Sequence, residues 1–278
     1  MDILEAMTVR RSVRTYTGRP ITALQSERIV AAISDAANPF GPAPYIKLIS
    51  FGEERDLRPS TYGMIRGACD YLTMGYGGSE ADALAAGFAM EQVVLEATRM
   101  GLGTCWIAAT FRGSDFERKA TWSREQPLKV VIPVGVAASK SLVERVARMA
   151  AGSDRRKPMD SLFFAPGFTG PLCGDSPFYE ALAMMRLAPS STNSQPWRTT
   201  GGADGRSVDF FSRDTSKLST LDCGIGICHF AMAESACGHS GSFARLAREP
   251  HHPAGLRYLT TYTRTGVNCA KADRKSVV

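Results

Sequence analysis

Residues 188–198 read Ala-Pro-Ser-Ser-Thr-Asn-Ser-Gln-Pro-Trp-Arg and are the most informative stretch of the chain. They follow a helix predicted over residues 176–187 and combine small hydrogen-bonding side chains with a Pro-Trp pair. Asn193 offers a donor and an acceptor to a ring edge of alternating carbonyl and N–H groups, and Ser190 and Ser191 can reach hydroxyl groups of a ligand. A helix-terminating turn held by side-chain-to-backbone hydrogen bonds is the other interpretation that these residues allow.

A second motif, Arg10-Arg11-Ser12-Val13-Arg14, lies 180 residues before Ser190 (190 − 10). If this segment is extended, its side chains alternate, and Arg10, Ser12 and Arg14 share one side. Two arginine forks and a hydroxyl suit a phosphomonoester, whereas a solvated basic loop is the alternative. Arg155-Arg156-Lys157-Pro158 leaves a similar choice between completing a phosphate site and forming an exposed linker.

The segment 101–111, Gly-Leu-Gly-Thr-Cys-Trp-Ile-Ala-Ala-Thr-Phe, begins where a helix predicted over residues 83–100 ends. Its run of small residues would let backbone N–H groups approach a planar ring closely. Cys105 is followed by Trp106-Ile107, and this apolar flank favours an inert buried thiol over a nucleophile.

The composition is that of a soluble globular protein, with 44% hydrophobic and 22% charged residues among 278 and a formal net charge of +6. The basic residues are mostly scattered, which does not favour nucleic-acid binding. The first residues do not read as a secretory signal, and the longest apolar stretch, 130–138, is too short to span a membrane. Seven cysteines without a CxxC pair indicate reduced thiols in the cytoplasm. The histidine spacing predicts no metal site, and no glycine pattern predicts a Rossmann dinucleotide site.

The second half of the sequence repeats landmarks of the first. Pro44 in Ala43-Pro44-Tyr45 corresponds to Pro196 in Gln195-Pro196-Trp197 at an offset of 152 residues (196 − 44). The helix that ends at Gly101 corresponds to a helix over 224–237 that ends at Gly238, at an offset of 137 (238 − 101). Strands are predicted at 45–51, 68–76 and 129–136, and helices at 22–37 and from 137 to about 151. We therefore expect two related halves, residues 1–165 and 166–264, and a disordered tail over 265–278.

Taken together, the motifs at 10–14, 101–106, 155–158 and 188–198 resemble those of the nitroreductase family, over roughly residues 8–260. Their layout is most similar to the TM nitroreductase-like branch, in which one chain holds two related halves and imitates the usual dimer. The resemblance implies an α+β fold in which each half has a mostly antiparallel sheet flanked by helices. The two halves would form an internal pseudo-dimer.

The resemblance also implies a binding site for FMN. Arg10, Arg11 and Ser12 would hold its phosphate, with Arg156 and Lys157 adding to that site, and Arg14 would reach the ribityl chain and the pyrimidine edge of the ring. Ser190, Ser191 and Asn193 would contact the same flavin from the second half, and Ala109 and Thr110 lie where the family offers a backbone N–H to flavin N5. The first-half counterpart of the loop, residues 38–44, lacks the matching Ser and Asn side chains, so one FMN per chain is expected.

The function that this implies is that of a cytoplasmic, FMN-dependent NAD(P)H oxidoreductase without a side-chain nucleophile. NADH or NADPH would reduce flavin N5, and a small nitroaromatic or quinone-like molecule would accept the electrons. A monomer or a weak homodimer is expected, with no membrane or nucleic-acid partner. A flavin-binding sensor or store without turnover and a flavin-free duplicated interaction module are the alternatives.

Overall fold

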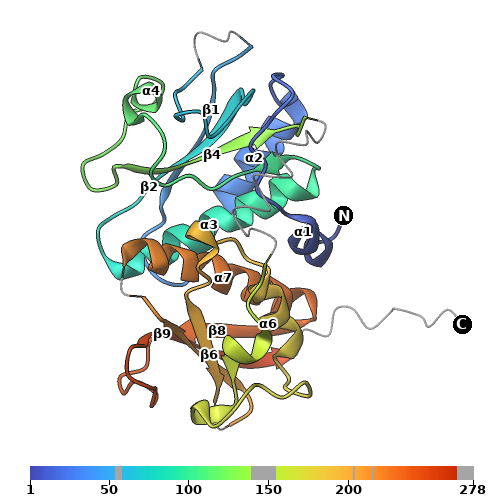
Figure 1. The fold of residues 1–278 in the computed structure, drawn as a ribbon, viewed down its shortest axis with the longest axis vertical. Coiled ribbons are helices and arrows are strands. Elements are labelled where there is room, and N and C mark those ends of the chain that lie inside the picture. The colour runs from blue at the N-terminus through green and yellow to red at the C-terminus, as the bar shows by residue number, and fades with distance from the viewer. Residues whose placement is uncertain (54–57, 139–154, 203, 215, 268–278) are drawn as a thin grey trace, which may run out of the picture. The chain divides into compact units, whose positions relative to one another are not determined.

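The computed structural model describes residues 1–53, 58–138, 155–202, 204–214 and 216–267 (Figure 1). The chain divides into two compact units, Met1–Arg155 and Arg156–Val278. This division falls ten residues before the expected boundary (165 − 155), so Arg156 and Lys157 belong to the second unit. The helix expected after Val136 and the tail beyond Val267 lie outside the described residues, but residues 265–267 are part of a strand and not of a disordered tail.

The first unit contains a four-stranded antiparallel sheet in the order β1-β2-β4-β3. Its elements, in chain order, are α1 (Ile3–Val9), α2 (Ala23–Asp35), β1 (Tyr45–Ser50), β2 (Asp70–Gly75), α3 (Glu80–Arg99), β3 (Gly103–Thr104), α4 (Gly113–Glu117) and β4 (Leu128–Gly135). Reciprocal capping boxes at Thr22 and Ser79 fix where α2 and α3 begin. Every residue of β2 is buried, which is expected of a central strand covered on both faces.

The second unit contains a five-stranded sheet in the order β5-β6-β7-β9-β8. Its elements are η2 (Met159–Ser161), β5 (Phe163–Phe164), η3 (Pro166–Phe168), α6 (Tyr179–Arg186), η4 (Ser191–Asn193), β6 (Trp197–Gly201), β7 (Ser207–Ser212), α7 (Lys217–Ala236), β8 (His239–Ala244) and β9 (Arg257–Val267). Only the short β5 pairs in parallel, with β6, and the other pairs are antiparallel. The fold is therefore α+β in both units.

The two units share one topology, which confirms the predicted repeat. Apart from the short helices α4 and η4, the order helix-strand-strand-helix-strand-strand runs from α2 to β4 and again from α6 to β9, and strand order 1-2-4-3 matches 6-7-9-8. β2 and α3 return as β7 and α7 at an offset of 137 throughout (207 − 70 and 217 − 80). The register repeats as well, since Tyr45 pairs with Gly75 and Trp197 pairs with Ser212.

The prediction that a glycine ends each of the two long helices is confirmed. Gly101 and Gly238, with φ of 77° and 83°, take the left-handed conformation that ends α3 and α7. The predicted start of the second helix at residue 224 was wrong, because α7 begins at Lys217. Its cap is Ser216, whose hydroxyl accepts the backbone N–H of Ser219 at 3.1 Å.

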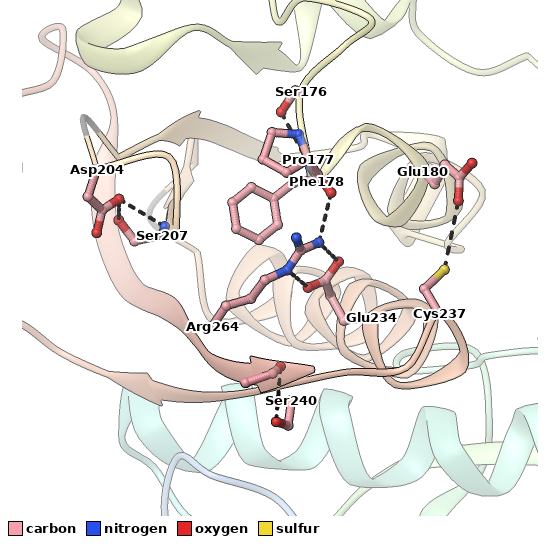
Figure 2. A network of polar contacts seen from close by, with 11 residues as sticks. Ser176, Pro177, Phe178, Glu180, Asp204, Ser207, Glu234, Cys237, Ser240 and Arg264 are labelled. Atoms are coloured by element: carbon pink, nitrogen blue, oxygen red, sulfur yellow. Dashed lines mark hydrogen bonds and ion pairs between the residues drawn. The ribbon is translucent and has the colours of Figure 1, made fainter. Parts of the chain in front are cut away.

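Arg264 ties β9 to the helical layer of the second unit (Figure 2). Its guanidinium forms two hydrogen bonds with the buried carboxylate of Glu234 on α7, at 2.6 and 2.8 Å, and a third with the carbonyl oxygen of Pro177 at 2.7 Å. It also lies 4.4 Å from the centre of the Phe178 ring. Glu234 is only 2% exposed, so its buried carboxylate charge is stabilised by the guanidinium of Arg264 and would be destabilising without it.

We expect Arg264→Ala to lower the free energy of unfolding by about 3 kcal/mol, since Glu234 would remain buried without its partner. Urea denaturation measures the change. Arg245→Ala is the control, because Arg245 pairs with the exposed Glu249 and its loss should cost under about 1 kcal/mol. Equal losses for the two variants would contradict the anchoring role.

Candidate functional site

The arginine motif of the first unit is extended, which is the condition under which its side chains alternate. The backbone at Ser12 bridges Thr104 of β3 in parallel, and the N–H of Val13 donates to the Thr104 carbonyl at 2.8 Å. On the other side, the N–H of Arg66 donates to the Arg14 carbonyl at 2.8 Å. A Cβ on Gly103 would lie 2.6 Å from Val13, so only glycine allows this close approach.

Three side chains of this segment act on the same buried thiol. Burial raises the pKa of Cys105, while the charge of Arg14, a hydrogen bond from Ser12 and the charge of Arg10 each lower it. Ser12 therefore lies within hydrogen-bond reach of the thiol, and both arginines are close enough for their charges to act on it. The raised pKa keeps Cys105 protonated and unreactive near neutral pH.

Arg10 is a buried cation at the end of α1. Its side chain is 9% exposed, and its Nε is buried without a hydrogen-bond partner. Burial lowers the pKa of Arg10, and the charge of Glu91 on α3 opposes that shift. Glu91 is fully buried and also accepts the indole N–H of Trp106 at 2.9 Å. Arg11, by contrast, is exposed.

Ala109 and Thr110 lie in an exposed bend after β3. The bend is anchored at Ile107, whose backbone N–H and carbonyl both pair with Val131 of β4, at 3.1 and 3.0 Å. The first unit therefore presents the backbone N–H groups of an exposed bend. The bend follows β3, the strand that pairs with the arginine segment.

The loop 190–196 of the second unit holds a strained backbone. Thr192, Asn193 and Gln195 have φ of 49°, 55° and 48°, a region that side chains other than glycine rarely adopt. Hydrogen bonds close the loop on itself: the N–H of Gln195 donates to the Ser190 hydroxyl at 2.9 Å, and the N–H of Asn193 donates to the Ser190 carbonyl at 3.0 Å. Such strain is typical of ligand sites, where surrounding contacts fix it.

Arg156 and Lys157 pack against this loop. Arg156 donates to the Asn193 side-chain oxygen at 3.1 Å and to the Leu187 carbonyl at 3.0 Å. The backbone N–H of Lys157 donates to the Gln195 side-chain oxygen at 2.8 Å, and its ammonium donates to the Ser194 carbonyl. Gln195 also donates to the Asn193 oxygen at 3.1 Å. A ligand that takes this amide oxygen must compete with two donors from the protein.

Arg198 is a site residue that the sequence interpretation missed. It is 7% exposed, and its Nη1 donates to the carbonyl oxygens of Gln195 at 3.1 Å and Trp197 at 2.6 Å. Burial lowers its pKa, as does the nearby Arg213, and both arginines together with burial lower the pKa of Lys157. Three cations thus gather beside the loop. The signal was an arginine directly after the Pro-Trp pair.

Asp222 of α7 is a second missed residue. Its carboxylate is 3% exposed, accepts the backbone N–H of Ser191 at 3.0 Å and is hydrogen-bonded by Ser194. Burial raises its pKa to about 7. A lone carboxylate among Leu221, Cys223 and Gly224 was the signal in the sequence. The structure therefore brings together Ser190, Ser191, Asn193, Arg156 and Lys157. The carboxylate of Asp222 binds the same loop at Ser191 and Ser194.

Within the described ranges, no helix has the length and apolar character needed to cross a membrane. No three metal-ligating side chains come together in that part of the chain.

The family assignment follows from comparison with known proteins. The model of a family described as "Putative TM nitroreductase" matches residues 2–234. The chain belongs to this nitroreductase family. No curated protein sequence matches the chain.

Solved structures agree with this assignment at the level of the fold. A "putative nitroreductase" from Thermotoga maritima is 19% identical, with a TM-score of 0.60 over 95% of this chain and 93% of that one. A nitroreductase with bound FMN from Bacteroides fragilis is 17% identical, with a TM-score of 0.41 over 51% of this chain and 91% of that one. A nitroreductase family protein from Clostridium novyi is 18% identical, with a TM-score of 0.41 over 50% and 87%.

The carboxyl of Asp222 gives a pH dependence with a defined sign. Its pKa of about 7 in the folded protein exceeds the ordinary value of 3.8, so between these values the folded state keeps a proton that the unfolded chain has lost. The free energy of unfolding should therefore fall as pH rises from about 4 to 7, by at most about 1.4 kcal/mol per pH unit. Asp222→Asn should remove this slope in urea titrations. A difference between variant and wild type that does not change with pH would contradict it.

Proposed function

We propose that this protein is an FMN-dependent NAD(P)H oxidoreductase that reduces a small nitroaromatic or quinone-like acceptor. The observation that carries the proposal is the extended segment at Arg10, Ser12 and Arg14. Ser12 hydrogen-bonds to Cys105, the charges of Arg14 and Arg10 act on the same thiol, and the buried guanidinium of Arg10 has an Nε without an acceptor. Membership of the nitroreductase family supports the same cofactor.

The residues present fit the phosphate of FMN. A phosphomonoester carries close to two negative charges and several acceptor oxygens. Arg10 supplies a cation, Ser12 supplies a hydroxyl, and the unpartnered Nε of Arg10 is a desolvated donor that an anion would satisfy. Arg11 is exposed, so its contribution would come through charge at longer range.

The second unit fits the polar edge of a flavin. Ser190, Ser191 and Asn193 lie in a loop whose strained backbone is fixed by Asp222, Arg156 and Lys157. A pre-formed loop loses little conformational entropy on binding. We expect the cations beside it to favour a ligand that gains negative charge on reduction.

Bound FMN would supply hydride transfer at N5, and the chain would bind, orient and tune it. Arg10 and Ser12 would hold the phosphate, and Arg14 would stabilise negative charge at the pyrimidine edge. The backbone N–H groups at Ala109 and Thr110 would donate to N5. No side-chain nucleophile or general base is needed for this chemistry.

The absorbance spectrum tests the proposal directly. We expect the purified protein to carry a flavin band that NADH or NADPH bleaches and that an added quinone restores. A flavin band that neither reductant changes would favour a flavin sensor or store. A colourless protein that cannot be loaded with FMN would contradict a flavin function altogether.

The stoichiometry should be one FMN per chain, because the first-unit counterpart of the binding loop lacks the matching Ser and Asn side chains. Flavin released by denaturation is quantified against protein. A ratio near two would show that both copies of the shared topology bind flavin.

Arg10→Ala should weaken FMN binding by about 1.5–3 kcal/mol, the range for hydrogen bonds to charged groups. Riboflavin lacks the phosphate, so its affinity should change much less. Fluorescence quenching during titration measures both ligands. Arg124→Ala, which removes an exposed arginine of the same unit, is the control. Equal losses for FMN and riboflavin would place Arg10 away from the phosphate.

A further inference from the structure

The first unit contains a cationic cavity that shares no residue with the candidate flavin site. The cavity has a volume of about 250 Å³ and opens beside α4. Among the described residues that line it, four are cations, Arg58, Arg112, Arg118 and Lys119, and one, Asp115, is a carboxylate.

The one carboxylate does not balance this charge. Asp115 is 6% exposed and accepts the backbone N–H of Ser60 at 2.8 Å and the guanidinium of Arg118 at 2.7 Å. It neutralises one cation of the four, so the lining side chains that the structure describes carry an excess of three positive charges (4 − 1). Mutual repulsion among them would be relieved by a bound anion.

Arg58 is fixed in place by acceptors that carry no charge. Its Nη2 donates to the carbonyl oxygens of Gly18 at 3.1 Å and Glu53 at 3.2 Å and to the sulfur of Cys69 at 3.5 Å. Burial raises the pKa of Cys69, which keeps its thiol neutral. The Nε of Arg58 is buried without a partner. A guanidinium held rigidly in this way is pre-organised to receive an anion.

The remaining cations line the same cavity from the turn that begins α4 and from just beyond its end. The backbone N–H of Arg112 donates to the Ser60 carbonyl at 2.9 Å, which joins the two segments that form the wall. The ammonium of Lys119 lies 5.5 Å from the centre of the Phe51 ring, and Phe51 also lines the cavity. The cationic cavity thus has one apolar surface, which the Phe51 ring forms.

We propose that this cavity binds a phosphate dianion, either as the free ion or as the phosphoryl group of an organic phosphate. Arginine forks match tetrahedral oxyanions, and the charge excess exceeds what a single carboxylate would satisfy. The volume is larger than the ~150 Å³ of a cavity that binds benzene, so there is room for a small group beside the phosphate. The Phe51 ring would contact that group.

The test is calorimetric titration of the full chain at pH 8 with inorganic phosphate and with phenyl phosphate, after loading with FMN and removal of all unbound flavin, so that free FMN does not compete for the cavity. We expect saturable binding of one anion, and a loss of about 10- to 100-fold in affinity for Arg112→Gln and for Lys119→Gln, the range for hydrogen bonds to charged groups. Arg124→Gln, an exposed arginine of the same unit outside the cavity, should bind as the wild type does. Tighter binding of phenyl phosphate would identify an organic phosphate, and equal binding the free ion.

Two results would overturn the proposal. The first is phosphate binding that the Arg112 and Lys119 variants leave unchanged, or that Arg124→Gln weakens as much. The second is binding lost in Arg10→Ala and retained in Arg112→Gln, which would place the anion at the arginine motif. Circular dichroism of the variants checks folding. The titration without FMN gives the same comparison if the protein binds no flavin, so the two proposals fail independently.

Discussion

The second unit depends on the burial of α7 and on the partners of three of its buried polar side chains, Asp222, His229 and Glu234. Residues 219–230 are buried without interruption, so α7 has no solvent-facing side along this stretch. Gly226 shows how close the packing is, since a Cβ there would lie 3.1 Å from both Met185 and Trp197. Polar groups in such a helix must find partners within the protein.

These three buried polar side chains of α7 each bind a different segment, so this one helix connects the loop, α6 and β9 of the second unit. Asp222 holds the loop at Ser191, His229 lies 3.2 Å from the Met184 carbonyl of α6 through its Nδ1, and Glu234 takes Arg264 of β9. The interactions that stabilise the fold therefore also position the candidate binding loop. The strained backbone at Asn193 persists because these contacts outweigh its cost.

The sequence predicted what depends on local rules. The glycine stops follow from conformational preference and the repeat offsets from matching landmarks, and Gly101 and Gly238 lie where these rules place them. It did not predict Arg198 or Asp222 as site residues, because burial and partners decide their roles. Arg198 and Lys157 become neighbours only through the fold, and no spacing along the chain brings 157 and 198 together.

The two units have the same scaffold but not the same polar residues, and this difference explains why only one loop has the features of a binding site. At the offset of 137 the counterpart of Asp222 is Ala85, which offers no carboxylate (222 − 137). At the offset of 152 Asn38 stands where the second unit has Ser190, and its side-chain oxygen accepts the N–H groups of Phe40 and Gly41 at 2.9 and 3.1 Å. The amide oxygen of Asn38 therefore stabilises a local turn. The buried carboxylate of α3 is instead Glu91, which supports Trp106 and offsets the burial of Arg10. Each long helix thus supports a different segment of its own unit: Glu91 of α3 opposes the burial of Arg10, and Asp222 of α7 holds the loop at Ser191.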